Sequence, residues 1–256
     1  MAKGFTIAVS GKGGTGKTML SALLVKYFSE VGSVFAIDAD PDSNLPQALG
    51  TVVSKSVGDE REAILNTPSY SGASGGIDKR TAFRAAISGL IVETPPFDVI
   101  AMGRSEGEGC YCPINDILCQ AIDTMVSSYD FIVIDCEAGL EHLSRRTERD
   151  VDIMLVITEP TMNGVLTAKR VQELAKELRT SFGTVSIIAN KVTPETKPAL
   201  DKTARENDVE IADYIPYDPN VYHFDIMGKP IIELPEDSVA CIAVSSICHK
   251  IIQDLA

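Results

Sequence analysis

The segment that most constrains the fold is a short apolar run that leads directly into a glycine-rich loop. Residues 6–10 read Thr-Ile-Ala-Val-Ser, which is typical of a buried strand, and the next eight read Gly-Lys-Gly-Gly-Thr-Gly-Lys-Thr. Four positions fit the phosphate-loop pattern G-x-x-x-x-G-K-[ST], namely Gly11, Gly16, Lys17 and Thr18. Because apolar residues follow at helical spacing, we expect a strand, a phosphate loop and a helix that begins near Lys17.

The residue types of this loop suit the phosphates of ATP or ADP. Glycines let successive backbone N–H groups converge on phosphate oxygens, and the positive end of the helix dipole adds to the same point. Lys17 would neutralise the β and γ charge, and the Thr18 hydroxyl would face Mg²⁺. The expected nucleotide-binding residues of the loop are Gly11, Gly13, Gly14, Thr15, Gly16, Lys17 and Thr18.

Composition narrows the class of protein. A chain of 256 residues with 45% hydrophobic residues can bury a large core, so we expect one domain over residues 1–256. The net charge of −13 disfavours nucleic acid as a partner. No apolar run approaches a membrane span or a signal peptide, which predicts a soluble, cytoplasmic protein without membrane attachment.

Acidic residues follow two further apolar runs. Residues 33–38 form a strand pattern that ends in Asp38, with Asp40 just beyond, and residues 129–135 form another that ends in Asp135. Parallel α/β sheets bind ligands at the carboxyl ends of their strands, so we expect Asp40 and Asp135 to serve hydrolysis, with Asp38 as a second contributor. Alternatively, Asp38 and Asp40 cap a turn, because Asp-Pro and Asp-Ser are common in turns.

The remaining periodicity predicts an α/β fold, with a doubly wound, mainly parallel sheet flanked by helices, as in the P-loop NTPase fold. Further strands are expected at 97–102, 151–158 and 184–191, and another that ends at 215–218. Helices are expected at 57–65, 80–88, 113–125, 162–182 and 235–255. Residues 47–96 are otherwise the least informative part of the chain.

Six cysteines are present, and a reducing cytosol would keep them from forming a disulfide framework. Cys110 and Cys112 form a Cys-x-Cys pair just before Pro113, which suits the first position of a helix. A helix N-terminus favours thiolate, and two such pairs across a two-fold dimer would supply four ligands for Zn²⁺ or a metal in transit. A redox dithiol, or two unconnected cysteines, would give the same pattern.

The other cysteines have simpler interpretations. Cys119 lies between the apolar positions of its helix and is expected to be inert, whereas Cys136 should point away from Asp135 and pack in the core. Cys241 and Cys248 lie seven residues apart on one helix face and are expected to pack inside.

The whole loop Lys-Gly-Gly-Thr-Gly-Lys-Thr, with its additional Lys12, resembles the deviant phosphate loop of the family that includes the nitrogenase iron protein, MinD and the partition ATPases. The resemblance implies that Lys12 reaches the nucleotide of a facing subunit, so that hydrolysis requires a homodimer. It also implies that Asn190, at the end of its strand, hydrogen-bonds adenine, although a helix cap is the alternative. Pro216 would provide a second edge of the base pocket.

Three segments together resemble CooC, the ATPases that help insert nickel into the active-site cluster of carbon monoxide dehydrogenase, with relatives that serve acetyl-CoA synthase. These segments are residues 38–43, 109–113 and 135–143. The resemblance implies an ATP-dependent dimer that binds Ni²⁺ or Zn²⁺ at its interface through Cys110 and Cys112, with either enzyme as the client. His142 would lie in the second nucleotide-sensing segment, or be an ordinary loop histidine.

Two other functions remain open at this stage. In a protein like the nitrogenase iron protein, an iron–sulfur cluster would bridge the dimer, and Cys136 would then compete with the Cys-x-Cys pair as a ligand. In a positioning ATPase no metal would bind. The predicted C-terminal helix has one lysine and several acids, which disfavours a MinD-like role at a membrane.

Overall fold

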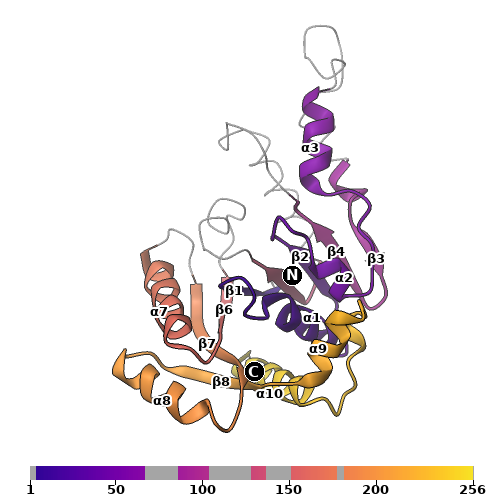
Figure 1. The fold of residues 1–256 in the computed structure, drawn as a ribbon. Coiled ribbons are helices and arrows are strands. Elements are labelled where there is room, and N and C mark those ends of the chain that lie inside the picture. The colour runs from indigo at the N-terminus through magenta and orange to yellow at the C-terminus, as the bar shows by residue number, and fades with distance from the viewer. Residues whose placement is uncertain (1–3, 67–85, 104–127, 137–150, 178–181, 256) are drawn as a thin grey trace, which may run out of the picture.

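The computed structural model describes residues 4–66, 86–103, 128–136, 151–177 and 182–255. Within this part of the chain the strands form one eight-stranded sheet in the order β3, β4, β2, β5, β1, β6, β7, β8 (Figure 1). The strands are β1 Phe5–Gly11, β2 Val34–Asp38, β3 Val92–Thr94, β4 Phe97–Ala101, β5 Phe131–Asp135, β6 Val151–Thr158, β7 Phe182–Val192 and β8 Ile211–Pro216.

The sheet is parallel except at one edge. The short β3 pairs antiparallel with β4, and the other described pairings are parallel. The central β1 lies between β5 and β6, so the loop that follows β1 emerges at the carboxyl edge of the sheet, where the neighbouring strands also end. The expected doubly wound α/β fold is therefore confirmed.

Helices cover both faces of this sheet. Their bounds are α1 Lys17–Phe28, α2 Leu45–Ala48, α3 Val57–Asn66, α7 Met162–Glu177, α8 Lys197–Glu206, α9 Pro219–Ile226 and α10 Val239–Leu255, with a 3₁₀ turn η2 at Ile231–Glu233. One apolar core lies between the sheet and α1 and α10, and a second lies between the sheet and α7 and α8. Figure 1 shows α1 and α10 together, with α7 and α8 on another side.

The helix after the glycine-rich loop is buried along most of its length. Leu20, Leu24 and Phe28 of α1 are fully buried, and Phe28 stacks on Phe131 with ring centroids 4.5 Å apart. Burial of such side chains contributes roughly 1.5–3 kcal/mol each. The helix is therefore held firmly against β5, which fixes its first turn near the ends of the strands.

Several element boundaries differ from those expected. The helix predicted to end at Phe182 ends at Glu177 within the described residues, and Phe182 instead begins β7. The helix predicted from Pro235 begins at Val239, because residues 236–238 form a turn tied to Asp218. The β3–β4 hairpin was not expected, because β3 spans only three residues and its sequence shows no strand periodicity.

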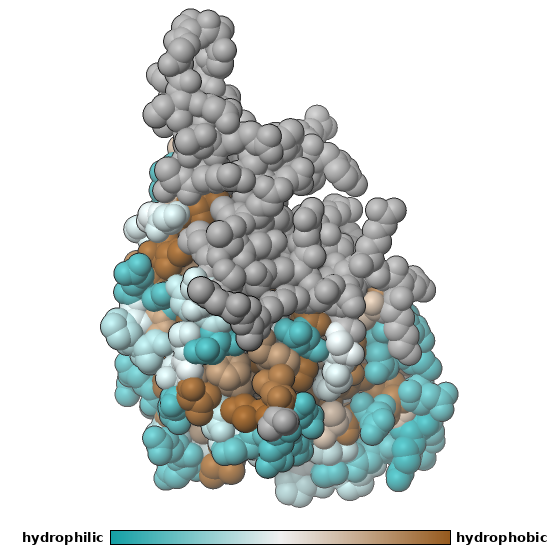
Figure 2. Space-filling model, turned by 180° about the vertical axis from the view of Figure 1, so that it is seen from behind, coloured by the Kyte–Doolittle hydropathy of each residue, from teal (hydrophilic) through white to brown (hydrophobic). Residues whose placement is uncertain are grey.

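The described surface mixes polar and apolar side chains. Figure 2 shows hydrophobic residues interspersed with hydrophilic ones on the face that it presents. Across the described residues, no helix combines the length and the apolar character that crossing a lipid bilayer requires.

Candidate functional site

The glycine-rich loop adopts a backbone that only glycine accommodates at two positions. Gly11 has φ of 154°, and a Cβ there would lie 2.3 Å from the Ile157 carbonyl oxygen of β6. Gly16 has φ of 100°, and a Cβ there would lie 2.3 Å from Asn190 Nδ2. The loop also closes on itself, because Thr15 donates from both its N–H and its hydroxyl to the carbonyl of Lys12. The sequence pattern thus reflects close packing of the loop against β6 and β7.

The first turn of α1 is joined to the end of β5. The Thr18 hydroxyl donates to one carboxylate oxygen of Asp135 at 2.8 Å, and the Ser21 hydroxyl donates to the other at 3.1 Å. Lys17 Nζ lies 3.8 Å from Asp40 Oδ2, and both side chains are largely buried. The structure therefore brings together Lys17, Thr18, Asp40 and Asp135, as the sequence predicted.

Asp38 is fully buried and organises the segment that carries Asp40. One of its carboxylate oxygens accepts the N–H of Asp40 at 3.1 Å, and the other accepts the N–H of Leu45 at 3.0 Å. This is the turn-capping role that was the alternative to a direct role in hydrolysis. Asp38 therefore shapes the turn over residues 39–45 and fixes where Asp40 lies.

Burial raises the pKa of both strand-end acids. Asp38 and Asp135 occupy paired positions on adjacent strands, and both are fully buried. Burial, reinforced by the charge of Asp135, raises the pKa of Asp38 to about 7. Burial raises the pKa of Asp135 to about 6 against the opposing hydrogen bond from Thr18 and the charge of Lys17. A cation placed beside these acids would remove this penalty.

The opposite side of the loop is bordered by β7. Asn190 is buried, and its Nδ2 donates to the Thr15 carbonyl at 2.8 Å, while its Oδ1 accepts the N–H of Lys191. Lys191 Nζ donates to the Gly14 carbonyl at 2.8 Å and pairs with Glu159 Oε1 at 2.7 Å. The side chain that was expected to contact a base therefore holds the phosphate loop in this structure.

A cavity of about 730 Å³ extends from the loop across the ends of β7 and β8. The loop lines one end of it, and Pro216, Tyr217 and Tyr222 line the other. Both tyrosines are substantially exposed, which leaves flat apolar surface facing the opening. The polar end and the apolar end suit a ligand that carries phosphates at one end and a planar ring at the other.

The donor set also fits Mg²⁺. The Thr18 hydroxyl and the Asp135 carboxylate are hard oxygen ligands, and Mg²⁺ is usually held by one or two carboxylates together with substrate phosphates. Among the described residues, no group of three or more His, Cys, Asp or Glu side chains is arranged to hold a metal ion. The site therefore fits a magnesium ion that arrives with a phosphate ligand.

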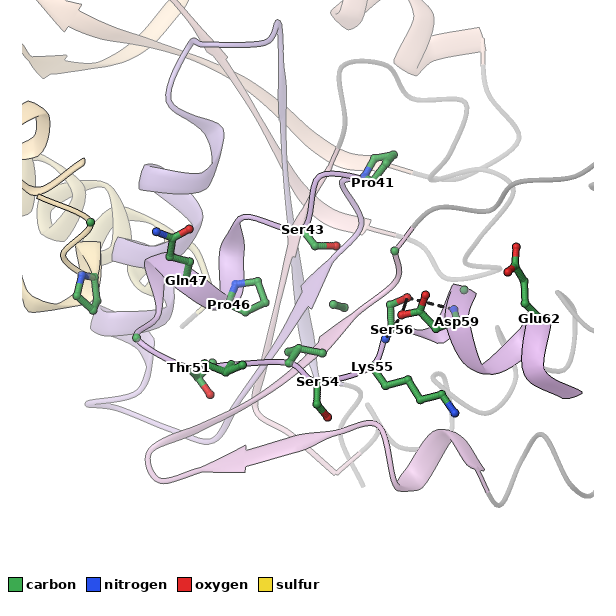
Figure 3. Close-up of a pocket in the computed structure, with 18 residues that line it drawn as sticks. Pro41, Ser43, Pro46, Gln47, Thr51, Ser54, Lys55, Ser56, Asp59 and Glu62 are labelled. Atoms are coloured by element: carbon green, nitrogen blue, oxygen red, sulfur yellow. Dashed lines mark hydrogen bonds between the residues drawn. The ribbon is translucent and has the colours of Figure 1, made fainter. Parts of the chain in front are cut away.

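A second hollow of about 790 Å³ lies beyond the segment that follows Asp40. Figure 3 shows Pro41, Ser43 and Pro46 near one side of it, with Asp59 and Glu62 of α3 on the other. Gln47 and Gly228 line both hollows, and the segment over residues 41–48, which includes α2, forms a common wall. A shift of this segment would change both hollows together.

Some predicted residues fall outside the described part of the chain. These are Cys110, Cys112, Cys119 and His142, so the Cys-x-Cys site stays a prediction. The expected core positions of Cys136 and Cys248 are confirmed, since both are buried, whereas Cys241 is only partly buried. Lys12 is exposed at the surface, and its expected role at a facing subunit stays a prediction.

Four contributors were not singled out from the sequence. Ser21 is one helical turn beyond Lys17, a spacing that a search for residues facing β5 could have found. Glu159 directly follows the predicted strand over residues 151–158, and Lys191 is the last residue of the predicted strand over residues 184–191. Ligand sites of parallel sheets lie at such strand ends, so these positions could have pointed to both residues. Asp218 caps α9 and also accepts from Ser238 and the N–H of Ala240, contacts that no local pattern indicates.

Comparison with known proteins agrees with this geometry. Residues 6–231 match the family model described as the CobQ/CobB/MinD/ParA nucleotide binding domain. The chain is 44% identical over 96% of its length to an uncharacterized ATP-binding protein of Methanocaldococcus jannaschii, of which it covers 98%. It is 30% identical over 92% of its length to the carbon monoxide dehydrogenase accessory protein CooC of Rhodospirillum rubrum, of which it covers 91%.

Solved structures confirm the fold. A ParA family ATPase from Chlorobium tepidum superposes with a TM-score of 0.71 at 18% identity, covering 97% of this chain and 99% of the other. The septum site-determining protein MinD of Pyrococcus horikoshii, complexed with Mg-ADP, gives 0.66 at 21% identity over 96% and 95%. From its matched motifs and its fold, the chain belongs to the CobQ/CobB/MinD/ParA family of nucleotide-binding domains.

Proposed function

We propose that this protein is a dimeric, magnesium-dependent ATPase that delivers nickel to carbon monoxide dehydrogenase or acetyl-CoA synthase. The observation that carries the ATPase part is the convergence of Lys17, Thr18, Asp40 and Asp135 around one end of the cavity. The likeness to the CooC protein and the Cys-x-Cys pair support the delivery of metal.

The described residues account for binding and orientation of ATP. Lys17 would contact the β and γ phosphates, and Thr18 and Asp135 would hold Mg²⁺, which offsets the charge on the phosphates. Asp40 borders the same cavity and would orient the attacking water once Lys17 turns to the phosphates. Pro216, Tyr217 and Tyr222 would surround the adenine.

The bound nucleotide would change the surface that faces the partner subunit by moving the segment that follows Asp40. Lys17 holds Asp40 in the present structure, so engagement of Lys17 by a phosphate would release that carboxylate. The segment over residues 41–48 borders both hollows and would move with that carboxylate. ATP would in this way favour the closed dimer, and hydrolysis would loosen it, so that metal leaves in a directed step.

Lys12 offers the sharpest test of the dimer. If Lys12 acts on the nucleotide of the facing subunit, Lys12→Ala should lower turnover by about 1,000-fold while the affinity for ATP changes little. Mixing Lys12→Ala with Asp135→Asn should then restore part of the activity in hybrid dimers. Full activity of Lys12→Ala alone would contradict the proposal.

Metal binding is tested by counting nickel and zinc per dimer with ATP, with ADP and without nucleotide, together with solution mass. We expect about one ion per dimer, the four-thiolate count of two Cys-x-Cys pairs. Cys110→Ser combined with Cys112→Ser should abolish binding, whereas Cys241→Ser, a matched control on α10, should not. A brown iron–sulfur cluster after anaerobic purification would favour the electron-transfer alternative. Unchanged activity of the double variant toward the client would favour a positioning ATPase.

A further inference from the structure

Lys191 is an unusual residue in the strand that borders the phosphate loop. Its φ is 57°, in the left-handed region, and it coincides with a register shift between Ala189 and Val192 where β7 pairs with β8. The other non-glycine residues with positive φ in the described part of the chain are Ser43 and Asp208, which have short polar side chains. Left-handed backbone disfavours a side chain by roughly 1–2 kcal/mol, and lysine is not among the residues that usually visit it.

The irregularity changes where the Lys191 side chain points. Consecutive residues of a regular strand face opposite sides of the sheet. Here both Asn190 and Lys191 reach the phosphate loop, because Asn190 bonds the Thr15 carbonyl and Lys191 bonds the Gly14 carbonyl, each at 2.8 Å. Bulges next to functional sites commonly redirect a side chain in this way.

The two contacts fix two consecutive peptide groups of the loop. In a trans peptide the C=O and the following N–H point in opposite directions. Holding the Gly14 and Thr15 carbonyls against β7 therefore fixes the directions of the Thr15 and Gly16 N–H groups as well. The Thr15 N–H closes the turn onto Lys12, and Gly16 lines the cavity.

Glu159 completes the arrangement from the end of the neighbouring strand β6. It follows β6 directly, and its Oε1 lies 2.7 Å from Lys191 Nζ, so the ammonium bridges a carboxylate and a loop carbonyl. Both side chains are about two-fifths exposed, at 44% and 38%. An exposed ion pair contributes at most about 1 kcal/mol, which does not by itself account for a strained backbone at Lys191. The contact with the loop supplies the missing reason.

We propose that Lys191, supported by Glu159, is a positioning residue that holds the phosphate loop ready for the phosphates of the nucleotide. This inference rests on the proposed nucleotide site, but on neither the metal nor the client. It assigns Lys191 no contact with the reacting atoms. Loss of the ammonium should loosen the loop and weaken the binding of nucleotides in proportion to the phosphates that the loop must hold.

The experiment compares the affinities of the full-length protein for ATP, ADP and AMP by titration calorimetry. Lys191→Met should weaken ATP and ADP about tenfold, the order expected for one charge-assisted hydrogen bond, and should change AMP by less than about twofold. Glu159→Gln should cause a smaller loss in the same direction. Lys191→Arg, which keeps a donor and the charge, should restore part of the affinity.

Two further variants separate positioning from stability. Lys169→Met is the matched control, because Lys169 Nζ also donates to a backbone carbonyl, that of Asn207 at 2.7 Å, away from the cavity. It should leave all three affinities unchanged. Lys191→Gly should relieve the backbone strain, so the nucleotide-free protein should melt no lower than Lys191→Met, yet its affinity for ATP should fall equally.

Hydrogen exchange supplies a readout without ligand. Residues 11–18 should exchange faster in nucleotide-free Lys191→Met than in the wild type or in Lys169→Met. If Lys191→Met bound ATP as the wild type does, or exchanged no faster in this segment, the positioning role would be wrong while the proposed function stood. If the wild type bound no ATP, both would fail.

Discussion

The two sides of the phosphate loop differ sharply in chemistry. On one side, β2 and β5 end in the acids Asp38 and Asp135, which contact α1 and the turn that carries Asp40. On the other side, β7 carries an amide and a lysine near its end, Asn190 and Lys191, which hold the loop itself. The acidic side is suited to a cation, whereas the β7 side is suited to fixing the loop. We therefore expect substitutions on the first side to affect turnover, and those on the second to affect affinity.

Of the two sides, the acidic side is expected to give the larger effect. Asp135→Asn keeps the shape and can still bond the hydroxyls of Thr18 and Ser21, but it removes the charge beside the cation. We expect turnover to fall about 100-fold, with binding of ADP in the absence of Mg²⁺ nearly unchanged. Steady-state ATPase assays and calorimetry with and without EDTA would measure this. Equal losses in turnover and in metal-free ADP affinity would contradict the distinction between the two sides.

The next prediction is that the two buried acids of this side make the free energy of unfolding depend on pH. The pKa values of Asp38 and Asp135 are raised to about 7 and about 6, so between pH 4 and pH 7 the folded, nucleotide-free protein holds more protons than the unfolded chain. These groups therefore lower the free energy of unfolding as pH rises through that range. Asp135→Asn should raise the free energy of unfolding by about 2 kcal/mol at pH 8, and by much less at pH 4.5.

Urea unfolding at several pH values, without nucleotide or Mg²⁺, would measure this difference. Glu206→Gln is the control, because Glu206 is an exposed acid in a surface pair. If Asp135→Asn raised the free energy of unfolding equally at every pH, the pKa of Asp135 would not be raised in the folded protein.

A smaller effect is expected from the β7 side. Asn190→Ala removes the bond to the Thr15 carbonyl and the side chain that packs beside Gly16. We expect about a tenfold loss of ATP affinity, with turnover at saturating ATP reduced by no more than about threefold. Steady-state kinetics of Asn190→Ala and the wild type would separate the change in KM from the change in kcat. If the main loss were in kcat, Asn190 would contribute to turnover, as is expected of the acids, and not to ATP affinity.

The smallest effect is expected at the outer rim of the cavity. Tyr222 is 61% exposed and lines the end opposite the loop. Tyr222→Ala should weaken ATP by about threefold, because an exposed ring contributes on the order of 0.5–1 kcal/mol by stacking. Val31→Ala, at an exposed apolar site away from the cavity, should have no effect on ATP binding. If the two variants changed the affinity for ATP equally, Tyr222 would not be a contact of the bound nucleotide.

The acidic side could be predicted from the sequence more fully than the β7 side. Gly11, Gly16, Lys17 and Thr18 are close in sequence, and their spacing alone indicates a phosphate loop. Asp135 was predictable because it ends an apolar run, and parallel strands end at one edge. The contacts of Asn190 and Lys191 with the loop were not predictable, because they depend on an irregularity in β7 that the residue pattern does not reveal.

The fold class, the position of the phosphate loop and the acids that face it could all be predicted from local sequence patterns. Those features follow from short-range periodicity and from the rule that parallel strands meet at one edge. The cap that Asp38 provides, the contacts of Asn190 and Lys191 with the loop, and the contact of Asp218 with α10 at the apolar end of the cavity appear only in the folded protein. The physical reason is that these contacts join segments distant in the chain, and their geometry exists only after the sheet and its two cores have formed.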